Sequence, residues 1–356
     1  MNSLLFTGFP GFIGRRLIKA LVEKFDYQDV FLIVEPSRVN QAREEISSYP
    51  DSSRYHIIMG DITQKKLGVD PETIEKLRGR VKHAFHLAAI YDLTVPWERA
   101  YRVNVIGTEN FVNFLAEIGG VERFVYFSTA YVSGTLEGTV FEDELATPPG
   151  FKNHYEHTKY LAEQIVRRNM SDIPTTIIRP AIVIGDSRTG ETDKFDGPYY
   201  VMIFFKKYPR WLPLPYIGKG EAEVNLVPID FIIDATVALT GLSKAVGKTY
   251  HLADPSPMTA RQLYELFCLK LRNSRPRGYV PLSIVRAILS IRPIARFWGV
   301  PPEALDYFDH KVHYDTKNTE SDLVPLGIKV PRLTEYIDNI VRFFEQHYRD
   351  KRFRVF

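Results

Sequence analysis

The strongest constraint on the fold is a glycine-rich turn close to the start of the chain. Ser3 to Phe6 is a short apolar run that predicts a strand, and apolar residues recur at helical spacing after Gly14. Between them lies Thr7-Gly8-Phe-Pro-Gly11-Phe-Ile-Gly14. Glycines so spaced allow a tight turn, a close approach of the backbone to a pyrophosphate, and close packing of helix on strand. The helix N-terminus then offers free N–H groups to the phosphates. The turn predicts a dinucleotide site formed by Thr7, Gly8, Gly11, Phe12, Ile13 and Gly14.

The predicted second strand, Asp29 to Val34, ends at the acidic residue Glu35. A carboxylate at this place accepts hydrogen bonds from the adenosine ribose hydroxyls and repels a 2′-phosphate, so Glu35 favours NAD. Arg38, three residues further on, is an alternative partner for a 2′-phosphate, and so are Arg15 and Arg16. The choice between NAD and NADP therefore stays open.

Two further predicted strands end in residues suited to the same ligand. The third strand ends at Asp61 and Ile62, where Asp61 is placed to meet the adenine edge. The fourth ends in Ala88 and Ala89, whose small side chains let the backbone lie beside the second ribose. His86, just before them, is predicted to be a packed core histidine, because small residues follow it and no second ligand is near in the sequence.

A second group of chemically useful residues lies between Phe124 and Lys159. An apolar run from Arg123 to Phe127 predicts a buried strand, which Ser128 and Thr129 follow. Tyr155 and Lys159 are four residues apart in a helical pattern, so they project from the same face. A lysine ammonium close to a phenol stabilises the phenolate and lowers the pKa of the phenol. The pattern predicts a hydroxyl, phenol and ammonium relay that moves one proton while a cofactor moves a hydride.

Together these motifs resemble the extended short-chain dehydrogenase/reductase superfamily. The resemblance rests on Thr-Gly-x-x-Gly-x-x-Gly, a strand ending Gly-Asp, His-x-Ala-Ala, Asn-Val-x-Gly-Thr, Ser-Thr before a glycine, and Tyr-x-x-x-Lys. It implies that Thr129, with Ser128 adjacent, supplies the active hydroxyl. It also implies that Asn104 supports the relay through water and that Lys159 additionally binds the nicotinamide ribose.

The strand predicted over 175–185 should border the nicotinamide ring, with Pro180 and Ile182 at the ring. Its Arg-Pro-Ala-Ile-Val lacks the asparagine usual in sugar-nucleotide epimerases and dehydratases. The segments that begin Gly185-Asp-Ser-Arg and Asn225-Leu-Val-Pro resemble instead the branch of fatty acyl-CoA reductases and carrier-protein thioester reductases. That resemblance implies an NAD(P)H-dependent oxidoreductase, with NADP as the usual cofactor, that reduces an apolar acyl thioester or aldehyde with Tyr155 as general acid/base. Alternatives that stay open are a ketoreductase or alcohol dehydrogenase for a sterol- or flavonoid-like substrate, a sugar-nucleotide enzyme, and a nucleotide-binding sensor without turnover.

Composition argues against several other classes of protein. The 356 residues include 46 basic and 43 acidic side chains, a balance that does not favour a nucleic-acid partner. The single Cys268 excludes an internal disulfide and a cysteine-rich metal site, and no metal is expected. No apolar run approaches the roughly 18 residues of a membrane span, so a cytoplasmic protein is expected. Peripheral contact with a membrane and a homodimer both stay open.

The expected fold is α/β, with a Rossmann-type doubly wound parallel sheet and a smaller, mostly helical C-terminal part. We assign residues 1–185 to the NAD(P)-binding domain, with 227–253 returning to it, and residues 186–226 and 254–356 to substrate binding. Helical patterns are predicted from Trp97 to Ala116 and from Val227 to Leu242, and long aromatic segments beyond Gly185 indicate binding loops. The apolar stretch 281–298 contains three arginines, and packing, a substrate wall and a membrane-surface contact are all open for it.

Overall fold

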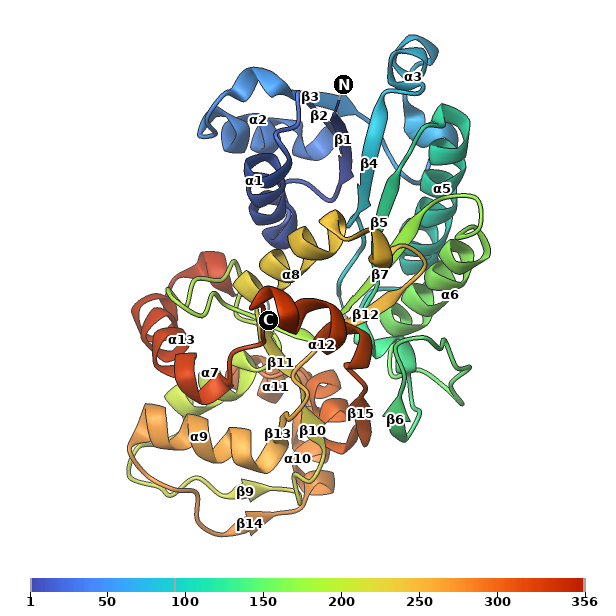
Figure 1. Cartoon of the computed structure of the whole chain (residues 1–356). Helices are drawn as coiled ribbons and strands as arrows, with labels where there is room; N and C mark the ends of the chain where they lie inside the picture. The colour runs from blue at the N-terminus through green and yellow to red at the C-terminus, as the bar shows by residue number, and fades with distance from the viewer. Residues whose placement is uncertain (1, 93, 355–356) are drawn as a thin grey trace.

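The computed structural model describes residues 2–92 and 94–354. Its centre is a seven-stranded parallel sheet (Figure 1). From one edge to the other the strands are β12 (Thr249–Leu252), β7 (Thr175–Pro180), β5 (Arg123–Phe127), β4 (Val81–His86), β1 (Ser3–Thr7), β2 (Asp29–Val34) and β3 (Tyr55–Met59). The chain runs outward in opposite directions from β1, so the order reverses between β1 and β4. The carboxyl ends of these two strands therefore border the crevice in which such sheets bind ligands. The predicted doubly wound sheet is confirmed.

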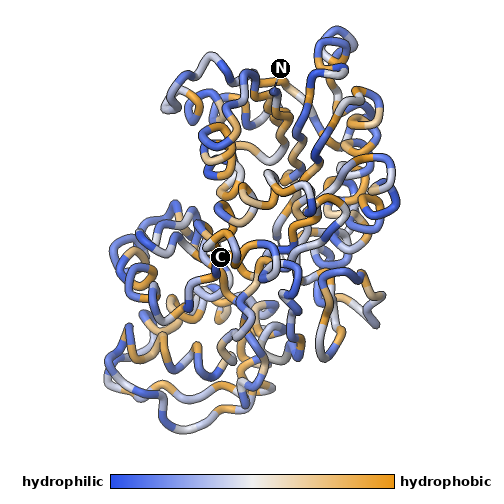
Figure 2. The backbone as a smooth tube through the Cα atoms, viewed as in Figure 1, coloured by the Kyte–Doolittle hydropathy of each residue, from blue (hydrophilic) through white to orange (hydrophobic). Residues whose placement is uncertain are grey.

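Helices cover both faces of this sheet, which explains why β1, β5 and β7 are buried at every residue rather than at alternate ones. One face carries α1 (Phe12–Phe25), α2 (Val39–Ser47) and α8 (Ile229–Gly241), and the other carries α3 (Pro71–Leu77), α5 (Gly107–Ile118) and α6 (His154–Arg168). All five residues of β5 are buried. Figure 2 shows hydrophobic segments both in the strands and in the helices that cover them.

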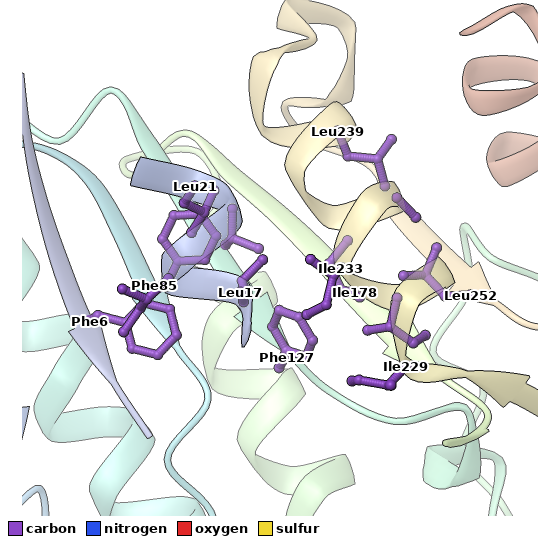
Figure 3. Close-up of a cluster of buried hydrophobic side chains, with 14 of the residues drawn as sticks. Phe6, Leu17, Leu21, Phe85, Phe127, Ile178, Ile229, Ile233, Leu239 and Leu252 are labelled. Atoms are coloured by element: carbon purple, nitrogen blue, oxygen red, sulfur yellow. The ribbon is translucent and has the colours of Figure 1, made fainter. Parts of the chain in front are cut away.

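The core on the first face joins segments that are far apart in the sequence. Leu17 and Leu21 of α1 lie beside Phe6 and Phe85 of the sheet, and Ile233 of α8 lies over Phe127 and Ile178 (Figure 3). Residues 226–252 thus return to the sheet, because α8 packs against α1 and β12 pairs with β7.

Two helices predicted from the sequence are divided in the structure. The helix predicted from Trp97 to Ala116 consists of α4 (Trp97–Ala100), a π-helical segment (Tyr101–Ile106) and α5. The segment predicted as helical from Val227 begins instead as the short strand β11 (Leu226–Pro228), which pairs with β8 (Ile182–Ile184). Pro228 ends that strand, and α8 follows it directly.

The remaining C-terminal residues form a mostly helical part with a core of its own. Its main helices are α7 (Tyr199–Lys207), α9 (Ala260–Arg272) and α13 (Leu333–His347), and α10 (Leu282–Leu289) and α11 (Arg292–Trp298) form an outer helical hairpin. The helix α12 (Lys317–Leu323) packs on β12 and α8. Three more strand pairs connect the loops: β6 (Gly138–Val140) with β15 (Val312–Tyr314), β9 (Tyr216–Ile217) with β14 (Tyr279–Val280), and β10 (Glu223–Val224) with β13 (Met258–Thr259). Within the described ranges, no helix has the length and apolar character that crossing a membrane requires.

Candidate active site

A cavity of about 1200 Å³ opens at the carboxyl ends of the strands and continues into the C-terminal helices. Most residues predicted to bind the cofactor or to act in the relay line it. They are Gly8, Gly11, Phe12, Ile13, Gly14, Glu35, Arg38, Asp61, Ile62, Ala88, Ala89, Thr129, Tyr155, Lys159, Pro180 and Ile182. Two predicted residues, Thr7 and Asn104, are buried behind the wall of the cavity.

The glycine turn has the shape that a pyrophosphate requires. Gly8 has φ +93°, and a Cβ atom there would lie 2.8 Å from the Leu87 backbone. A Cβ on Gly11 or Gly14 would meet the Gly8 carbonyl oxygen at 2.8 Å or 2.6 Å. No acidic residue stands in the first turn of α1, so its N–H groups and positive dipole end face the cavity without a competing carboxylate. The turn therefore fits a dinucleotide phosphate.

The Thr7 side chain holds the backbone of the strand end that lines the cavity. Its hydroxyl lies 2.7 Å from His86 Nδ1 and accepts a hydrogen bond from the Ala88 N–H at 3.4 Å. On its other side His86 bonds the Thr108 hydroxyl at 3.2 Å and stacks on Phe111. Burial, and then the nearby Lys159, lower the pKa of His86 to about 3. His86 is therefore a neutral core histidine, as predicted from the sequence.

Some of the residues predicted to meet the adenosine end of a dinucleotide are free to bind it, and others are already held in ion pairs. Glu35 and Arg38 are exposed and line the cavity. Arg15 instead pairs with Asp193 at 2.5 Å, and Arg16 pairs with Glu191 at 2.7 Å. The alternative that these two arginines meet a 2′-phosphate is therefore not supported, because both are engaged by carboxylates of the loop after β8.

Ser128 and Thr129, the two candidate hydroxyls, have different partners. Ser128 Oγ donates a hydrogen bond of 2.6 Å to the buried carboxylate of Glu163. Glu163 also binds the buried guanidinium of Arg179 at 2.6 Å, so Ser128 belongs to an internal polar network. Thr129 lines the cavity, its hydroxyl accepts a hydrogen bond from the Tyr131 N–H at 3.3 Å, and its side chain lowers the pKa of the Tyr155 phenol in part.

Tyr155 lies on the first turn of α6 and reaches the cavity beside Tyr91. The two rings meet edge to face with centroids 5.0 Å apart. Burial raises the pKa of the Tyr155 phenol above its ordinary value, although the hydrogen bond with Thr129 lowers it in part. The sequence-based expectation was a lowered pKa. The structure differs because desolvation of the phenol dominates.

Lys159 lies one turn further along α6, and its ammonium group is hydrogen-bonded to β5. Its Nζ donates hydrogen bonds to the Tyr126 hydroxyl at 2.9 Å and to the Phe127 carbonyl at 2.6 Å. Burial lowers the pKa of Lys159 to about 7, although Glu163 raises it in part. The sequence placed both residues on one face of a helix but could not indicate that β5 holds the lysine.

Asn104 lies in the π-helical segment, a form of helix that often marks functional sites. Its amide oxygen accepts the Ile90 N–H at 2.8 Å, and its amide nitrogen donates to the Thr158 hydroxyl at 3.0 Å and to the Ile90 carbonyl at 3.3 Å. The side chain thus ties the loop after β4 to α6. Among the described residues, its hydrogen bond to α6 is made with Thr158 and not with Tyr155 or Lys159.

Beyond the relay the cavity becomes aromatic and apolar. This arm is lined by Phe204, Tyr208, Leu263, Tyr264, Phe267, Val285, Leu289, Trp298 and Leu305. Sequence reasoning expected aromatic binding loops after Gly185, and the arm is built largely from α7, α9, α10 and α11. It missed Tyr91, Tyr131 and Tyr307 beside the relay, because each lies in a segment without periodicity or a motif.

Comparison with known proteins assigns the nucleotide-binding part to a family. A family model described as male sterility protein, an NAD-binding domain, matches residues 6–236. The glycine betaine reductase ATRR of Emericella nidulans is 25% identical over 284 residues, which cover 74% of this chain and 22% of that protein. The fatty acyl-CoA reductase wat of Drosophila melanogaster is 26% identical over 279 residues, which cover 67% of this chain and 53% of that protein. The chain thus spans about a fifth to about a half of the length of these relatives.

The same comparison extends to solved structures. The terminal R domain from the myxalamid PKS-NRPS biosynthetic pathway superposes with a TM-score of 0.82 at 23% identity, over 99% of this chain and 92% of that domain. At that identity the likeness is one of fold. It includes the C-terminal helices, since nearly the whole chain is covered.

Proposed function

The chain belongs to the male sterility protein family of NAD-binding domains, which has the extended short-chain dehydrogenase/reductase fold, and from this premise we propose that it reduces an apolar acyl thioester to an aldehyde. The main support for the proposal is that one cavity contains all the parts that the reaction needs. It joins the glycine turn, the Thr129, Tyr155 and Lys159 group, and the aromatic arm. Its volume of about 1200 Å³ exceeds that of most single-ligand pockets, and so suits a dinucleotide together with a second ligand.

The aromatic arm supports an acyl substrate over a sugar nucleotide. Its walls come from leucine, valine and aromatic side chains, which favour contact with methylene groups over contact with sugar hydroxyls. A polar ligand with many hydroxyls would leave most of them without partners there. The family members named above include a fatty acyl-CoA reductase, which agrees with an acyl chain in this arm.

In the proposed reaction a thioester, a reduced nicotinamide cofactor and a proton give an aldehyde, a free thiol and the oxidised cofactor. The cofactor supplies the hydride to the carbonyl carbon. Thr129 orients the carbonyl oxygen, and Tyr155 donates the proton that this oxygen needs when its negative charge develops, which gives a hemithioacetal. The carbon–sulfur bond then breaks as the hydroxyl proton returns to Tyr155, and the leaving sulfur takes a proton from water to become the free thiol. A tyrosine phenol is protonated at neutral pH, which is the state that a proton donor requires, and burial raises the pKa of Tyr155 further. Lys159, held by Tyr126 and the Phe127 carbonyl, would bind the nicotinamide ribose when the cofactor is present.

We further propose that NADH is preferred to NADPH. Glu35 stands exposed at the end of β2 on the cavity wall, where its carboxylate repels a 2′-phosphate. We expect Glu35→Ala to improve kcat/KM with NADPH by about tenfold, because a like-charge contact is removed while Arg38 stays in place. Glu44→Ala, an exposed change on α2, serves as the control and should leave the NADPH to NADH ratio unchanged. A ratio that Glu35→Ala does not alter would contradict the preference.

The function is tested by following oxidation of NADH and NADPH with octanoyl-CoA, palmitoyl-CoA, the matching aldehydes and a set of cyclic ketones. Turnover of the acyl-CoAs, with release of free thiol, is the expected result. Tyr155→Phe should lower kcat by about 10²–10⁴-fold and leave NADH binding nearly unchanged, because the phenol hydroxyl acts on the proton and not on the cofactor. Turnover of ketones alone would replace the proposal with a ketoreductase, and absence of turnover with every substrate would favour a sensor.

A further inference from the structure

The outer face of the α10–α11 hairpin exposes apolar side chains that a water-facing surface does not require. Ile284, Ile288, Ile291 and Phe297 are 49%, 44%, 51% and 66% exposed. Ile284 and Ile288 are four residues apart on α10 and so share one face. Single exposed apolar residues are common, but four within residues 284–297 form a cluster of the kind that marks an interaction site.

This hairpin lies in the most one-sided charge environment of the sequence. Residues 266–302 contain seven basic residues and no acidic residue, although the whole chain has 46 basic and 43 acidic residues. Arg286 pairs with Asp306 from the following segment. Arg292 and Arg296 are exposed and form no ion pair within the part of the chain that the structure describes. The apolar cluster is therefore flanked by positive charge available to an anionic partner.

The inner face of the same hairpin closes the aromatic arm of the cavity. Val285 and Leu289 of α10 line the arm, and Ile288 lines it while remaining 44% exposed. One helix thus separates the cavity from the outside. Figure 1 shows α10 and α11 in the half of the molecule remote from the N-terminus, away from the helices that flank the sheet.

We propose that the α10–α11 hairpin docks on the surface of a membrane that contains anionic lipids. A short amphipathic helix inserts its apolar face at the level of the acyl chains, and arginines beside it bind phosphate groups and gain from the negative surface potential. Isoleucine and phenylalanine flanked by arginine suit this environment. Each helix is far too short to span a bilayer, so the contact is peripheral.

Docking in this way has a consequence that rests on the proposed function. The apolar arm behind α10 would then open next to the acyl chains of the membrane, so that a long-chain substrate reaches it without crossing water. Docking itself is independent of turnover, and the two proposals can therefore fail separately.

The test is co-sedimentation of the full chain with vesicles of phosphatidylcholine alone or with about 30 mol% phosphatidylserine. We expect binding to the anionic vesicles only, and weaker binding as salt rises from about 0.1 M to about 0.5 M, because screening shortens the reach of the arginines. Binding to neither vesicle, or equal binding to both, would overturn the proposal.

Two paired variants locate the contact. Arg292→Glu with Arg296→Glu should weaken partition by roughly a hundredfold, since each arginine contributes about fivefold and each reversal adds repulsion. Ile291→Ser with Phe297→Ser should weaken it by at least about tenfold through lost apolar burial. The matched control, Arg43→Glu with Lys65→Glu, places the same charge change on exposed sites of the sheet-bearing part and should reduce binding far less. An equal effect of the control would overturn the assignment to this hairpin.

Activity measurements separate the two proposals. None of the four substituted residues lines the cavity, so both paired variants should keep their turnover of a short, water-soluble acyl-CoA. If vesicle binding fails while acyl-CoA is still reduced, only the docking proposal is overturned. Binding to an immobilised acidic acyl carrier protein through the same arginines, without vesicle binding, would likewise replace the membrane with a protein partner.

Discussion

Lys159 carries its ammonium group into a site where it is only 3% exposed, and this burial makes the stability of the protein depend on pH. Burial lowers the pKa of Lys159 from 10.5 to about 7, so between these values the folded state binds fewer protons than the unfolded chain. The cost of burying the charge is fully present below about pH 7 and disappears as the pH rises toward 10.5.

We expect the free energy of unfolding of Lys159→Met, relative to the parent protein, to fall as the pH rises from about 6 to about 9. Urea unfolding of both proteins at several pH values measures this difference in unfolding free energy. Lys65→Met, at an exposed lysine, should show a flat difference, and the same flat result for Lys159→Met would contradict the lowered pKa.

At the scale of the element, α6 is fixed to the sheet by an ion pair that no water reaches. Glu163 and Arg179 are both fully buried, and Glu163 also accepts hydrogen bonds from Ser128 and from Arg167. Glu163→Gln leaves the Arg179 guanidinium without its counter-charge, which should lower the free energy of unfolding by about 3–5 kcal/mol. Although burial raises the pKa of Glu163, Arg179 and its other partners lower it to about 2, from an ordinary 4.5. The stabilisation is therefore present above about pH 4.5 and is lost as the pH falls toward 2.

Chemical denaturation between about pH 2.5 and pH 7 tests this dependence. The difference between the parent protein and Glu163→Gln should be largest at neutral pH and should narrow toward acid. Glu23→Gln, at an exposed glutamate of α1, should change stability little at any pH. If the two unfolding free energies differ little at neutral pH, the Arg179 guanidinium is stabilised by groups other than the Glu163 carboxylate.

The sequence predicts single elements well, but it does not predict the contacts between them. The sequence predicts β2 and β5 to the residue, because their apolar runs and bounding polar residues are local signals. It likewise predicts the glycine turn, whose geometry depends on the glycines themselves. It cannot predict that Arg15 pairs with Asp193, 178 residues away, or that Lys159 binds Tyr126, since these contacts depend on how the elements pack. The same limit explains the division of the helix predicted from Trp97 to Ala116.

In the whole molecule, the C-terminal part and the sheet-bearing part meet at the first turn of α6, and Tyr307 supplies a contact between them. Its hydroxyl accepts a hydrogen bond of 3.0 Å from Asn153, the N-cap residue of α6, and donates one of 2.9 Å to the buried carboxylate of Glu156. The residue that follows the cap by two positions is Tyr155, so this contact fixes the C-terminal segment beside the residue that we propose as the proton donor. Its ring also packs edge to face on Tyr131, with centroids 5.2 Å apart.

Tyr307→Phe keeps the ring and removes only the hydroxyl, and it should therefore loosen the connection without emptying the core. Glu156 would keep the Lys152 N–H as a partner but lose the donor on its other oxygen, which should cost about 1–3 kcal/mol of unfolding free energy. Amide hydrogen exchange should accelerate in residues 302–307 and at the start of α6, and should stay unchanged in β1 and β2, because local opening frees only the segments that the hydroxyl joins. The matched control is Tyr279→Phe, at a tyrosine that is 57% exposed, for which neither stability nor exchange should change. If exchange accelerates across the whole sheet instead, the two parts unfold as one cooperative unit and Tyr307 stabilises the entire molecule rather than their junction.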